Sequence, residues 1–306
     1  MRLAIVGLGL VGTSVGLALK SLTQEIEIVG HDPEPSRLKR AKELGAIDKS
    51  HWNLPRSCEG ADIILLDLPL DELEKTLRPL AEVVSEETLI IDTIPVKRPV
   101  LEIAQRSLGG RGRFVGGHVV SPRLLGGAEP SAELLQGAVF FLVATEEAPA
   151  QAIDMATTLA QAVGATPYYI GPEEHDGLVA AMRQLPWLVA MAVVRSLQVQ
   201  PGWQDRSRIV GGEFAALGAI LAEEEGGLEA LWANVDNLRH WLKTCIQELQ
   251  HLEGLLSQGE KAALEEVLAQ TGEACREWLS PKDERPVGES VRSVWRSMFL
   301  GNWDRR

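Results

Sequence analysis

The chain has 306 residues, of which 45% are hydrophobic and 24% are charged, and its formal net charge is −13. These values are typical of a globular protein long enough for two domains. The negative charge argues against a nucleic-acid partner, so any anionic ligand must be held by local Arg or Lys side chains. No uninterrupted apolar run reaches the roughly 18 residues of a membrane-spanning helix, so we expect no membrane partner.

Cysteine usage and the N-terminus bear on the cellular compartment. Cys58, Cys245 and Cys275 lie far apart and outside any CxxC pattern. They indicate reduced, buried thiols, and we expect a cytoplasmic protein. The N-terminus itself has the pattern of a first strand, so no signal peptide is expected.

A glycine motif follows that first apolar run, which extends from Met1 to Val6. The motif consists of Gly7, Leu8, Gly9, Leu10, Val11 and Gly12, and a helix-compatible stretch follows it from Thr13 to Lys20. A second apolar run ends at Gly30 and leads to Asp32, twenty residues after Gly12. A strand, a GxGxxG loop, a helix and a later acid together form a dinucleotide-binding fingerprint.

Each motif residue has a physical role in such a site. Gly7 permits the tight turn, Gly9 lets the backbone approach a pyrophosphate, and Gly12 lets the helix pack against the strand. The N-terminus of the helix offers free N–H groups to the phosphates. Asp32 would accept hydrogen bonds from the ribose hydroxyls and repel a 2′-phosphate. This favours NAD over NADP, although the nearby Arg37, which we also expect at the cofactor, leaves NADP open.

Up to about residue 170, short apolar runs alternate with helical patterns. This alternation predicts βαβ units around a mainly parallel sheet, an α/β Rossmann-like fold, and we assign residues 1–171 to an NAD-binding domain. Because the carboxyl ends of such strands line the cofactor crevice, Leu68 and Pro69 are expected at the cofactor. The predicted strands cover residues 3–6, 27–29, 63–66, 89–91, 114–117, 139–143 and 166–169, and the predicted helices residues 35–44, 70–84, 99–108 and 148–163.

After Ile170 the pattern becomes helical. Pro172 suits the first turn of a helix, and apolar residues recur at helical spacing as far as Leu279. We assign residues 172–280 to an all-α domain that carries substrate-binding residues and dimerises. The apolar stripes fit a homodimer interface and an internal core equally well. Residues 281–306 form a tail, either loosely docked or packed on a partner subunit or over the cleft.

Two polar groups are candidates for chemistry. His118 follows two glycines at the predicted end of a strand, where a histidine is either a general base at neutral pH or a structural cap. Arg206 and Arg208 lie between two helical stretches. An arginine there either binds a carboxylate through a bidentate fork or forms an ordinary surface ion pair.

Taken together, the motifs resemble the prephenate/arogenate dehydrogenase family over roughly residues 1–280. The resemblance implies a nucleotide-binding domain followed by a helical dimerisation domain. It also implies oxidation of a cyclohexadiene hydroxyl, hydride transfer to the nicotinamide and loss of the ring carboxylate as CO₂, a step of tyrosine biosynthesis. The matching pieces are Gly7–Gly12, Asp92…Val96-Lys97, Gly116-Gly-His118, Pro172-Glu-Glu-His175-Asp176, Leu185-Pro186 and Asp205-x-Ser-Arg208.

The resemblance also assigns roles to individual residues. His118 is similar to the catalytic histidine that accepts the hydroxyl proton. Lys97 is similar to a lysine beside the cofactor cleft, and we assign it to the catalytic residues as well. Arg208 is similar to the arginine that grips a substrate carboxylate. His175 is similar to a histidine at the start of the interdomain helix, and we expect it to contact the substrate.

The chain departs from the family pattern around the expected substrate. Pro95 replaces a serine, and Thr93 is expected to compensate for it at the cofactor. Gln184 and Trp187 replace two histidines, and we expect Arg183 and Trp187 to contact the substrate instead. Asp67 replaces a small apolar residue, and we expect it near the nicotinamide.

Three functions remain open. The first is NAD-dependent oxidation of prephenate or arogenate. The second is a related oxidoreductase with a shifted substrate, which the changes at Pro95, Gln184 and Trp187 favour. The third is a non-catalytic NAD-binding regulatory protein, which needs the glycine motif and Asp32 but no turnover.

Overall fold

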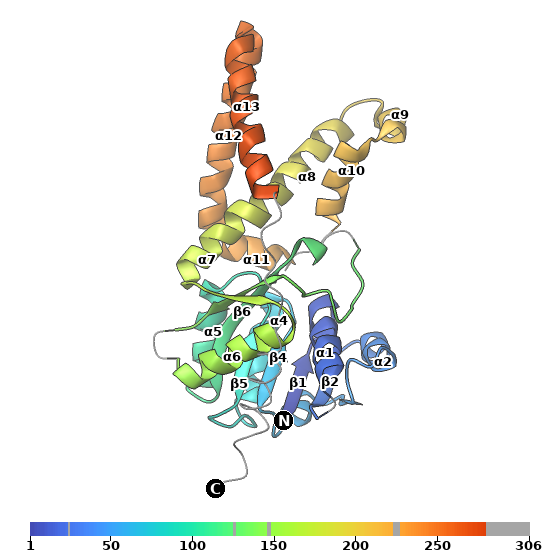
Figure 1. Ribbon diagram of the computed structural model, residues 1–306, viewed down its shortest axis with the longest axis vertical. Helices are drawn as coiled ribbons and strands as arrows, with labels where there is room; N and C mark the ends of the chain where they lie inside the picture. The colour runs from blue at the N-terminus through green and yellow to red at the C-terminus, as the bar shows by residue number, and fades with distance from the viewer. Residues whose placement is uncertain (24, 125–126, 146–147, 223–226, 280–306) are drawn as a thin grey trace.

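The computed structural model describes residues 1–23, 25–124, 127–145, 148–222 and 227–279 (Figure 1). It confirms an α/β domain followed by a helical domain. The first domain consists of β1 (Arg2–Val6), α1 (Leu10–Leu22), β2 (Glu27–His31), α2 (Pro35–Glu43), β3 (Lys49–Ser50), α3 (Leu54–Cys58), β4 (Ile63–Leu66), α4 (Leu70–Leu80), β5 (Leu89–Asp92), α5 (Arg98–Leu108), β6 (Arg113–Val120), η1 (Pro122–Leu124), β7 (Val139–Val143), α6 (Ala150–Ala162) and β8 (Thr166–Tyr169). The helical domain consists of α7 (Pro172–Val179), η2 (Ala180–Gln184), α8 (Leu185–Gln198), α9 (Trp203–Arg206), η3 (Ser207–Ile209), α10 (Gly212–Leu221), α11 (Gly227–Ala233), α12 (Val235–Gln258) and α13 (Lys261–Leu279).

The sheet of the first domain has the order β3-β2-β1-β4-β5-β6-β7-β8. Its pairs are parallel except that β6 and β7 run antiparallel. The strand order reverses beside β1, where β2 lies on one side and β4 on the other. In a sheet of this kind ligands bind outside the carboxyl ends of the strands at that reversal.

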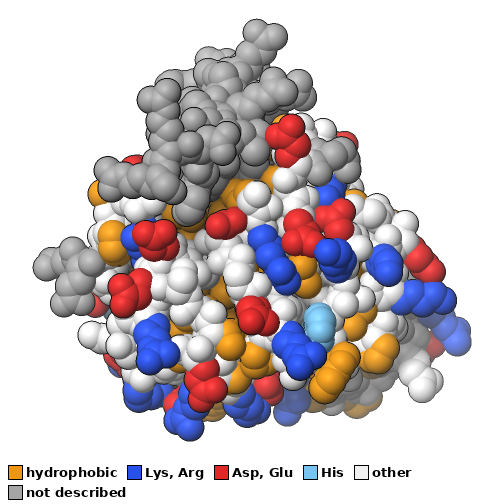
Figure 2. Space-filling model, turned by 90° about the horizontal axis from the view of Figure 1, so that it is seen from below, with side chains coloured by type: hydrophobic (Ala, Val, Ile, Leu, Met, Phe, Trp, Pro, Cys, Tyr) orange, Lys and Arg blue, Asp and Glu red, His pale blue; other side chains and the backbone are white. Residues whose placement is uncertain are grey.

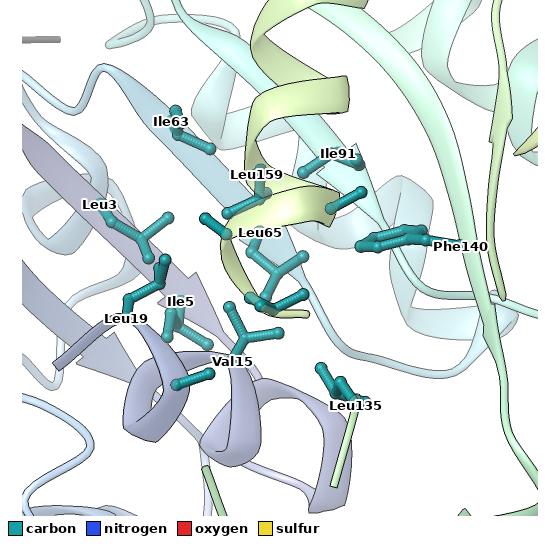
Figure 3. Packing of buried hydrophobic residues seen from close by; sticks show 14 of the residues in the cluster. Leu3, Ile5, Val15, Leu19, Ile63, Leu65, Ile91, Leu135, Phe140 and Leu159 are labelled. Atoms are coloured by element: carbon teal, nitrogen blue, oxygen red, sulfur yellow. The ribbon is translucent and has the colours of Figure 1, made fainter. Parts of the chain in front are cut away.

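Alternate residues of the central strands enter two separate cores, because successive side chains of a strand point to opposite faces. Leu3 and Ile5 of β1 lie in the core formed with α1 and α6, whereas Ala4 and Val6 lie in the core formed with α4 and α5. Figure 3 shows the first of these cores, with Val15 of α1 and Leu159 of α6 packed over the sheet. Helices therefore cover both faces, which explains why the strands are uniformly apolar.

The helical domain projects from the carboxyl edge of the sheet as two arms (Figure 1). One arm contains α8 and α10, and the other is the α12–α13 hairpin. The shorter α11 packs against α4, where its Ala230 is 1% exposed within the second core. This contact and the loop at Asn234 join the arms to the first domain.

Some details differ from the sequence-based prediction. The two-residue edge strand β3 and the short helix α3 were not predicted. The helical pattern that runs through Leu228 to Leu256 in the sequence is divided between α11 and α12 at Asn234. The tail assigned to residues 281–306 lies outside the described residues.

Helices α7, η2 and α8 form one helical stretch of 27 residues, Pro172–Gln198, which is long and apolar enough to cross a membrane. Length and composition alone make weak evidence for a span. The first turns of this stretch contain the buried polar residues His175 and Asp176, which bind groups of the first domain. Its exposed apolar residues, Met182 and Val193 among them, are also consistent with contact between subunits.

Candidate functional site

The glycine loop has the geometry expected of a dinucleotide site. Gly7 adopts a left-handed φ of +93°, and a Cβ there would lie 1.9 Å from the carbonyl oxygen of Asp67. A Cβ on Gly12 would lie 2.3 Å from the carbonyl oxygen of Gly7, so only glycine allows this close packing. The amides of Leu10 and Val11 begin α1, where an N–H has no intrahelical partner. These groups fit a dinucleotide pyrophosphate.

Asp32 lies where the sequence predicted it, directly after β2. Its carboxylate accepts hydrogen bonds from the amides of Leu8, at 2.8 Å, and Glu34, also at 2.8 Å. Arg37 lies 4.0 Å from Asp32 and pairs more closely with Glu34, at 3.1 Å. Asp32 thus ties the glycine loop to β2 and presents an acid at the expected ribose position.

The structure corrects one expectation at this end of the site. Asp67, expected near the nicotinamide, lies against the glycine loop, where its Oδ2 accepts a hydrogen bond from the amide of Gly12 at 2.7 Å. Thr93 donates its hydroxyl to Asp67 Oδ1 at 2.7 Å, and its expected contact with the cofactor stays a prediction. Both side chains are therefore engaged with each other and with the loop.

His118 lies within β6 and not at its end. The strand pairs in parallel with β5 only as far as Val115, and its second half pairs with β7. His118 consequently lies beyond the carboxyl end of β5, at the edge where ligands bind in this fold. It is 3% exposed and stacks against Phe141 of β7, with ring centroids 6.0 Å apart.

His118 is the first member of a buried relay with His175 and Asp176. Its Nδ1 lies 3.0 Å from Nε2 of His175, and Nδ1 of His175 lies 2.9 Å from Oδ1 of Asp176. An ionised Asp176 only accepts hydrogen bonds, so Nδ1 of His175 donates to it and Nε2 of His175 accepts from His118. The arrangement leaves Nε2 of His118 without a proton, as a general base requires.

The pKa shifts agree with this assignment. Burial, reinforced by His175 and Arg183, lowers the pKa of His118 well below its ordinary value. Burial also lowers the pKa of His175, although Asp176 opposes the shift. For Asp176, burial raises the pKa, but hydrogen bonds from His175 and the backbone of Arg98 and Lys97 bring it below the ordinary value. These directions favour neutral imidazoles beside an ionised carboxylate.

Asp176 is held at the N-terminus of α5. Its carboxylate accepts hydrogen bonds from the amides of Lys97, at 2.6 Å, and Arg98, at 3.0 Å, and from Nε of Arg98 at 3.2 Å. Arg98 also binds Asp236 of α12 through two hydrogen bonds of 2.8 Å. The side chain of Asn234 donates to the carbonyl oxygen of Asp176 at 2.8 Å. These contacts fix the relay to both domains.

Lys97, predicted from the resemblance to be catalytic, is fully buried. Its Nζ is ion-paired with Asp92, which also accepts hydrogen bonds from the amides of Ile94 and Gly117. The side chain is therefore inside the protein, behind β6, and its backbone amide supports Asp176. This placement fits a positioning residue better than a group that contacts substrate.

Arg183 is brought to His118 by a π-helical turn. Its Nη1 lies 3.4 Å from Nε2 of His118. The turn arises because the amide of Leu185 bonds the carbonyl of Ala180, five residues back, and Pro186 has no N–H for the usual α-helical bond. Arg183 thus places a positive charge beside Nε2 of His118.

Gln184, which stands where the family has a histidine, and the expected substrate residues Trp187 and Arg208 lie farther from this turn or in other contacts. Gln184 is buried and accepts a hydrogen bond from Asn234, so it belongs to the interdomain contact. Trp187 is half-buried on α8. The side chain of Arg208 is 80% exposed and lies 3.9 Å from Asp205, beyond the far end of α8. Because this helix of 14 residues is about 21 Å long, Arg208 and His118 are not brought together within one subunit.

The residues Asp176, Arg98, Asn234 and Asp236 were not assigned roles from the sequence. Only Asp176 carried a signal, because it follows His175 in the Pro172–Asp176 motif. A cavity of about 660 Å³ elsewhere in the first domain is also no guide. It is lined by Met1, Asp62 and Glu87 among others, at the amino ends of the strands, opposite the ligand-binding edge. Figure 2 views that end of the molecule, where acidic and basic side chains are interspersed.

The sheet order, the glycine loop and Asp32 define the first domain as a dinucleotide-binding domain. Comparison with known proteins agrees: residues 15–169 match the family model for the nucleotide-binding domain of prephenate dehydrogenase, and residues 171–270 match that for its dimerization domain. The chain belongs to the prephenate dehydrogenase family. The first match begins after the glycine loop, so the loop is independent support.

Curated relatives share moderate similarity with the chain. The prephenate dehydrogenase of Bacillus subtilis is 29% identical over 192 residues, which cover 62% of this chain and 52% of the relative. The cyclohexadienyl dehydrogenase of Zymomonas mobilis is 26% identical over 214 residues, covering 68% and 70% of the two chains. The chain therefore spans about half the length of the first relative.

Solved structures show the same fold. A prephenate dehydrogenase from A. aeolicus, in complex with hydroxyphenyl propionate and NAD+, superposes with a TM-score of 0.81 at 24% identity, covering 90% of this chain and 98% of that one. An arogenate dehydrogenase from Synechocystis gives a TM-score of 0.73 at 24% identity, covering 91% and 100%.

Proposed function

We propose that this protein is an NAD-dependent dehydrogenase that oxidises prephenate or arogenate with loss of CO₂, and that it acts in the cytoplasm as a homodimer. The observation that carries the proposal is the buried relay, which leaves an unprotonated nitrogen of His118 at the ligand-binding edge of a dinucleotide-binding sheet. The family membership and the names of the relatives support the substrate class.

Different residues of the chain bind the cofactor and carry out the proton transfer along the cleft. The amides of Leu10 and Val11 would hold the pyrophosphate, and Asp32 would hold the ribose. Leu68 and Pro69, which follow β4, would line the crevice, and bound NAD would supply the hydride acceptor. Nε2 of His118 then takes the proton of the substrate hydroxyl as hydride leaves the same carbon. His175 and Asp176 hold the imidazole in the tautomer that this step needs.

Recognition of the substrate carboxylate is assigned first to Arg183. Its guanidinium lies beside His118, so a carboxylate bound there is held next to the base. In a single subunit Arg208 is too far away to contribute. We propose that Arg208 binds the substrate carboxylate only if association of subunits brings the arm that contains α8 and α10 over a substrate site.

The homodimer is supported by the exposed apolar residues of the arms. On α8, Met191 is 38% exposed and Leu197 is 37% exposed. On α12, Ile246 is 44% and Leu249 57% exposed. Helices with such exposed stripes are typical of subunit interfaces, and they lie in the region that matches the dimerization domain.

The test is NADH formation with purified protein, in parallel with prephenate and arogenate and with NAD and NADP. Turnover with NAD and one of the two substrates supports the proposal. Hydride transfer to NAD from other hydroxy acids alone would favour the second candidate, a related oxidoreductase with a shifted substrate, for which Arg183 beside His118 is the supporting observation. NAD binding with no turnover on any substrate would contradict the enzymatic role.

A further inference from the structure

Asp67 places a carboxylate at the phosphate end of the cofactor site. Its Oδ2 accepts the hydrogen bond of Gly12, the third N–H of α1. A Cβ on Gly9 would lie 3.1 Å from the same oxygen, so the carboxylate lies close over the glycine loop. Because the free amides of Leu10 and Val11 begin the same helix, a bound pyrophosphate and Asp67 would share one helix N-terminus.

Two negative charges at one helix terminus repel each other. The site therefore binds the pyrophosphate more readily when the Asp67 carboxyl is protonated and neutral. We infer that Asp67 controls the affinity of this protein for NAD by taking up a proton when the dinucleotide binds. The inference rests on the part of the proposed function that places NAD at the glycine loop.

The hydrogen bonds around Asp67 allow both protonation states. When Asp67 is ionised, the hydroxyl of Thr93 donates to its Oδ1 at 2.7 Å. The same hydroxyl lies 3.4 Å from the carbonyl oxygen of Leu66, so it has a second acceptor. A protonated Asp67 donates to Thr93, which then donates to Leu66, and Gly12 keeps its acceptor.

The charged groups around Asp67 act in opposite directions. Burial raises the pKa of the Asp67 carboxyl, and the negative charge of Asp32 raises it further, whereas Thr93, Gly12 and Arg37 lower it, and the net shift is upward. An incoming pyrophosphate raises it again. Between the pKa of the free protein and that of the complex, NAD binding therefore weakens by up to about tenfold for each unit of rising pH.

The test is calorimetric titration of NAD into the full-length protein from about pH 6 to about pH 8, in two buffers that differ in ionisation enthalpy. The comparison of buffers counts the protons taken up. Within this range, the wild type should take up a proton on binding NAD, with an uptake that varies with pH and approaches one per NAD between the pKa of Asp67 in the free protein and its pKa in the complex. Asp67→Asn keeps the shape and an acceptor for Gly12, and should bind NAD about tenfold more tightly at the higher pH, with no proton uptake. Asp71→Asn removes an exposed charge from the first turn of α4 and should behave as the wild type.

Tighter, pH-independent binding of NAD by Asp67→Asn supports the inference. NAD binding by Asp67→Asn when the wild type shows none also supports it. Equal affinities of wild type and Asp67→Asn, absence of proton uptake by the wild type, or absence of NAD binding in both would overturn it. Asp67→Ser serves as a second variant if Asp67→Asn does not fold. Because these readouts need no turnover, a protein that binds NAD with proton uptake but oxidises neither prephenate nor arogenate would break only the proposed function.

Discussion

Two helix N-termini of the first domain each hold a carboxylate that comes from another part of the chain. At α5, Asp176 is surrounded by donors: two backbone amides, the guanidinium of Arg98 and the imidazole of His175. At α1, Asp67 has one backbone amide and one hydroxyl, and a second acid, Asp32, lies nearby. The pKa of Asp176 is lowered and that of Asp67 is raised.

The difference shows that a helix terminus alone does not decide the charge of a nearby acid. The number of donors and the sign of the neighbouring charges do. Asp176 stays ionised and can orient His175 and, through it, His118. Because the pKa of Asp67 is raised, its carboxyl takes up a proton more readily and can respond to an incoming anion. The reacting end of the cleft is thus fixed, whereas the phosphate end is adjustable.

The largest effect should come from removing the base at the fixed end. His118→Asn should lower turnover by about 10² to 10⁴-fold, the usual contribution of a general base, while the affinity for NAD stays near that of the wild type. Steady-state kinetics and calorimetric NAD binding would measure the two quantities. Unchanged turnover would remove His118 from the mechanism.

A smaller loss should follow when the carboxylate of the relay is neutralised. Asp176→Asn no longer selects the tautomer of His175, so kcat should fall by about tenfold to 100-fold, as for other groups that orient an acting residue. The matched control is Glu173→Gln, an exposed acid in the first turn of the same helix, α7. If both variants retained wild-type kcat, the relay would have no role in catalysis.

The positive charge beside the base should affect both substrate affinity and pH dependence. Arg183→Gln should raise KM about tenfold, because a charged hydrogen bond to the substrate carboxylate is lost. It should also move the acid limb of kcat/KM to higher pH, because Arg183 lowers the pKa of His118. In the wild type, that limb should lie below the ordinary histidine pKa of 6.5.

Arg206→Gln, which changes an exposed arginine on α9, is the control for net charge. If Arg208→Ala raises KM while Arg183→Gln does not, the carboxylate is bound by the arm and not at the π-helical turn.

The smallest effect concerns the contact between domains. The hydrogen bond from Arg98 lowers the pKa of Asp236 from 3.8 to about 2. A lowered folded-state pKa contributes stability above the unfolded value, and this contribution is lost as pH falls toward about 2. Because the pair is partly exposed, Asp236→Asn should lower the free energy of unfolding by only about 0.5–1 kcal/mol near neutral pH, with a smaller difference in acid. Urea unfolding of the wild type and of Asp236→Asn, near neutral pH and in acid, measures this difference in the free energy of unfolding. An equal difference at both would contradict the ionic origin.

The fold was largely predictable because buried parallel strands are apolar throughout and the glycine loop has a local signature. Strand β1 and the glycine loop were found this way. Strand β3 was missed because two exposed residues, Lys49 and Ser50, carry no hydrophobic pattern. The break at Asn234 was missed because the apolar stripe continues across it, while the polar contacts of Asn234 come from distant residues.

The site was predictable only where one residue carries the chemistry. The glycines before His118 placed it at the ligand-binding edge of the sheet, and its role as the base stays a prediction. The role of Asp176 depends on Arg98, 78 residues away, and on Asp236 of α12, so no local pattern reveals it. Asp67 was placed at the wrong end of the cleft because the sequence shows that it follows a strand but not which neighbour its side chain meets.

The protonation of His118 is the central claim, and histidine nitrogen NMR tests it most directly. The chain has six histidines, and the signals of His118 can be assigned by their loss in His118→Asn. Near neutral pH, we predict a neutral ring with the proton on Nδ1 and a bare Nε2. A positively charged ring, or a neutral ring with the proton on Nε2, would contradict the relay and its role in proton transfer.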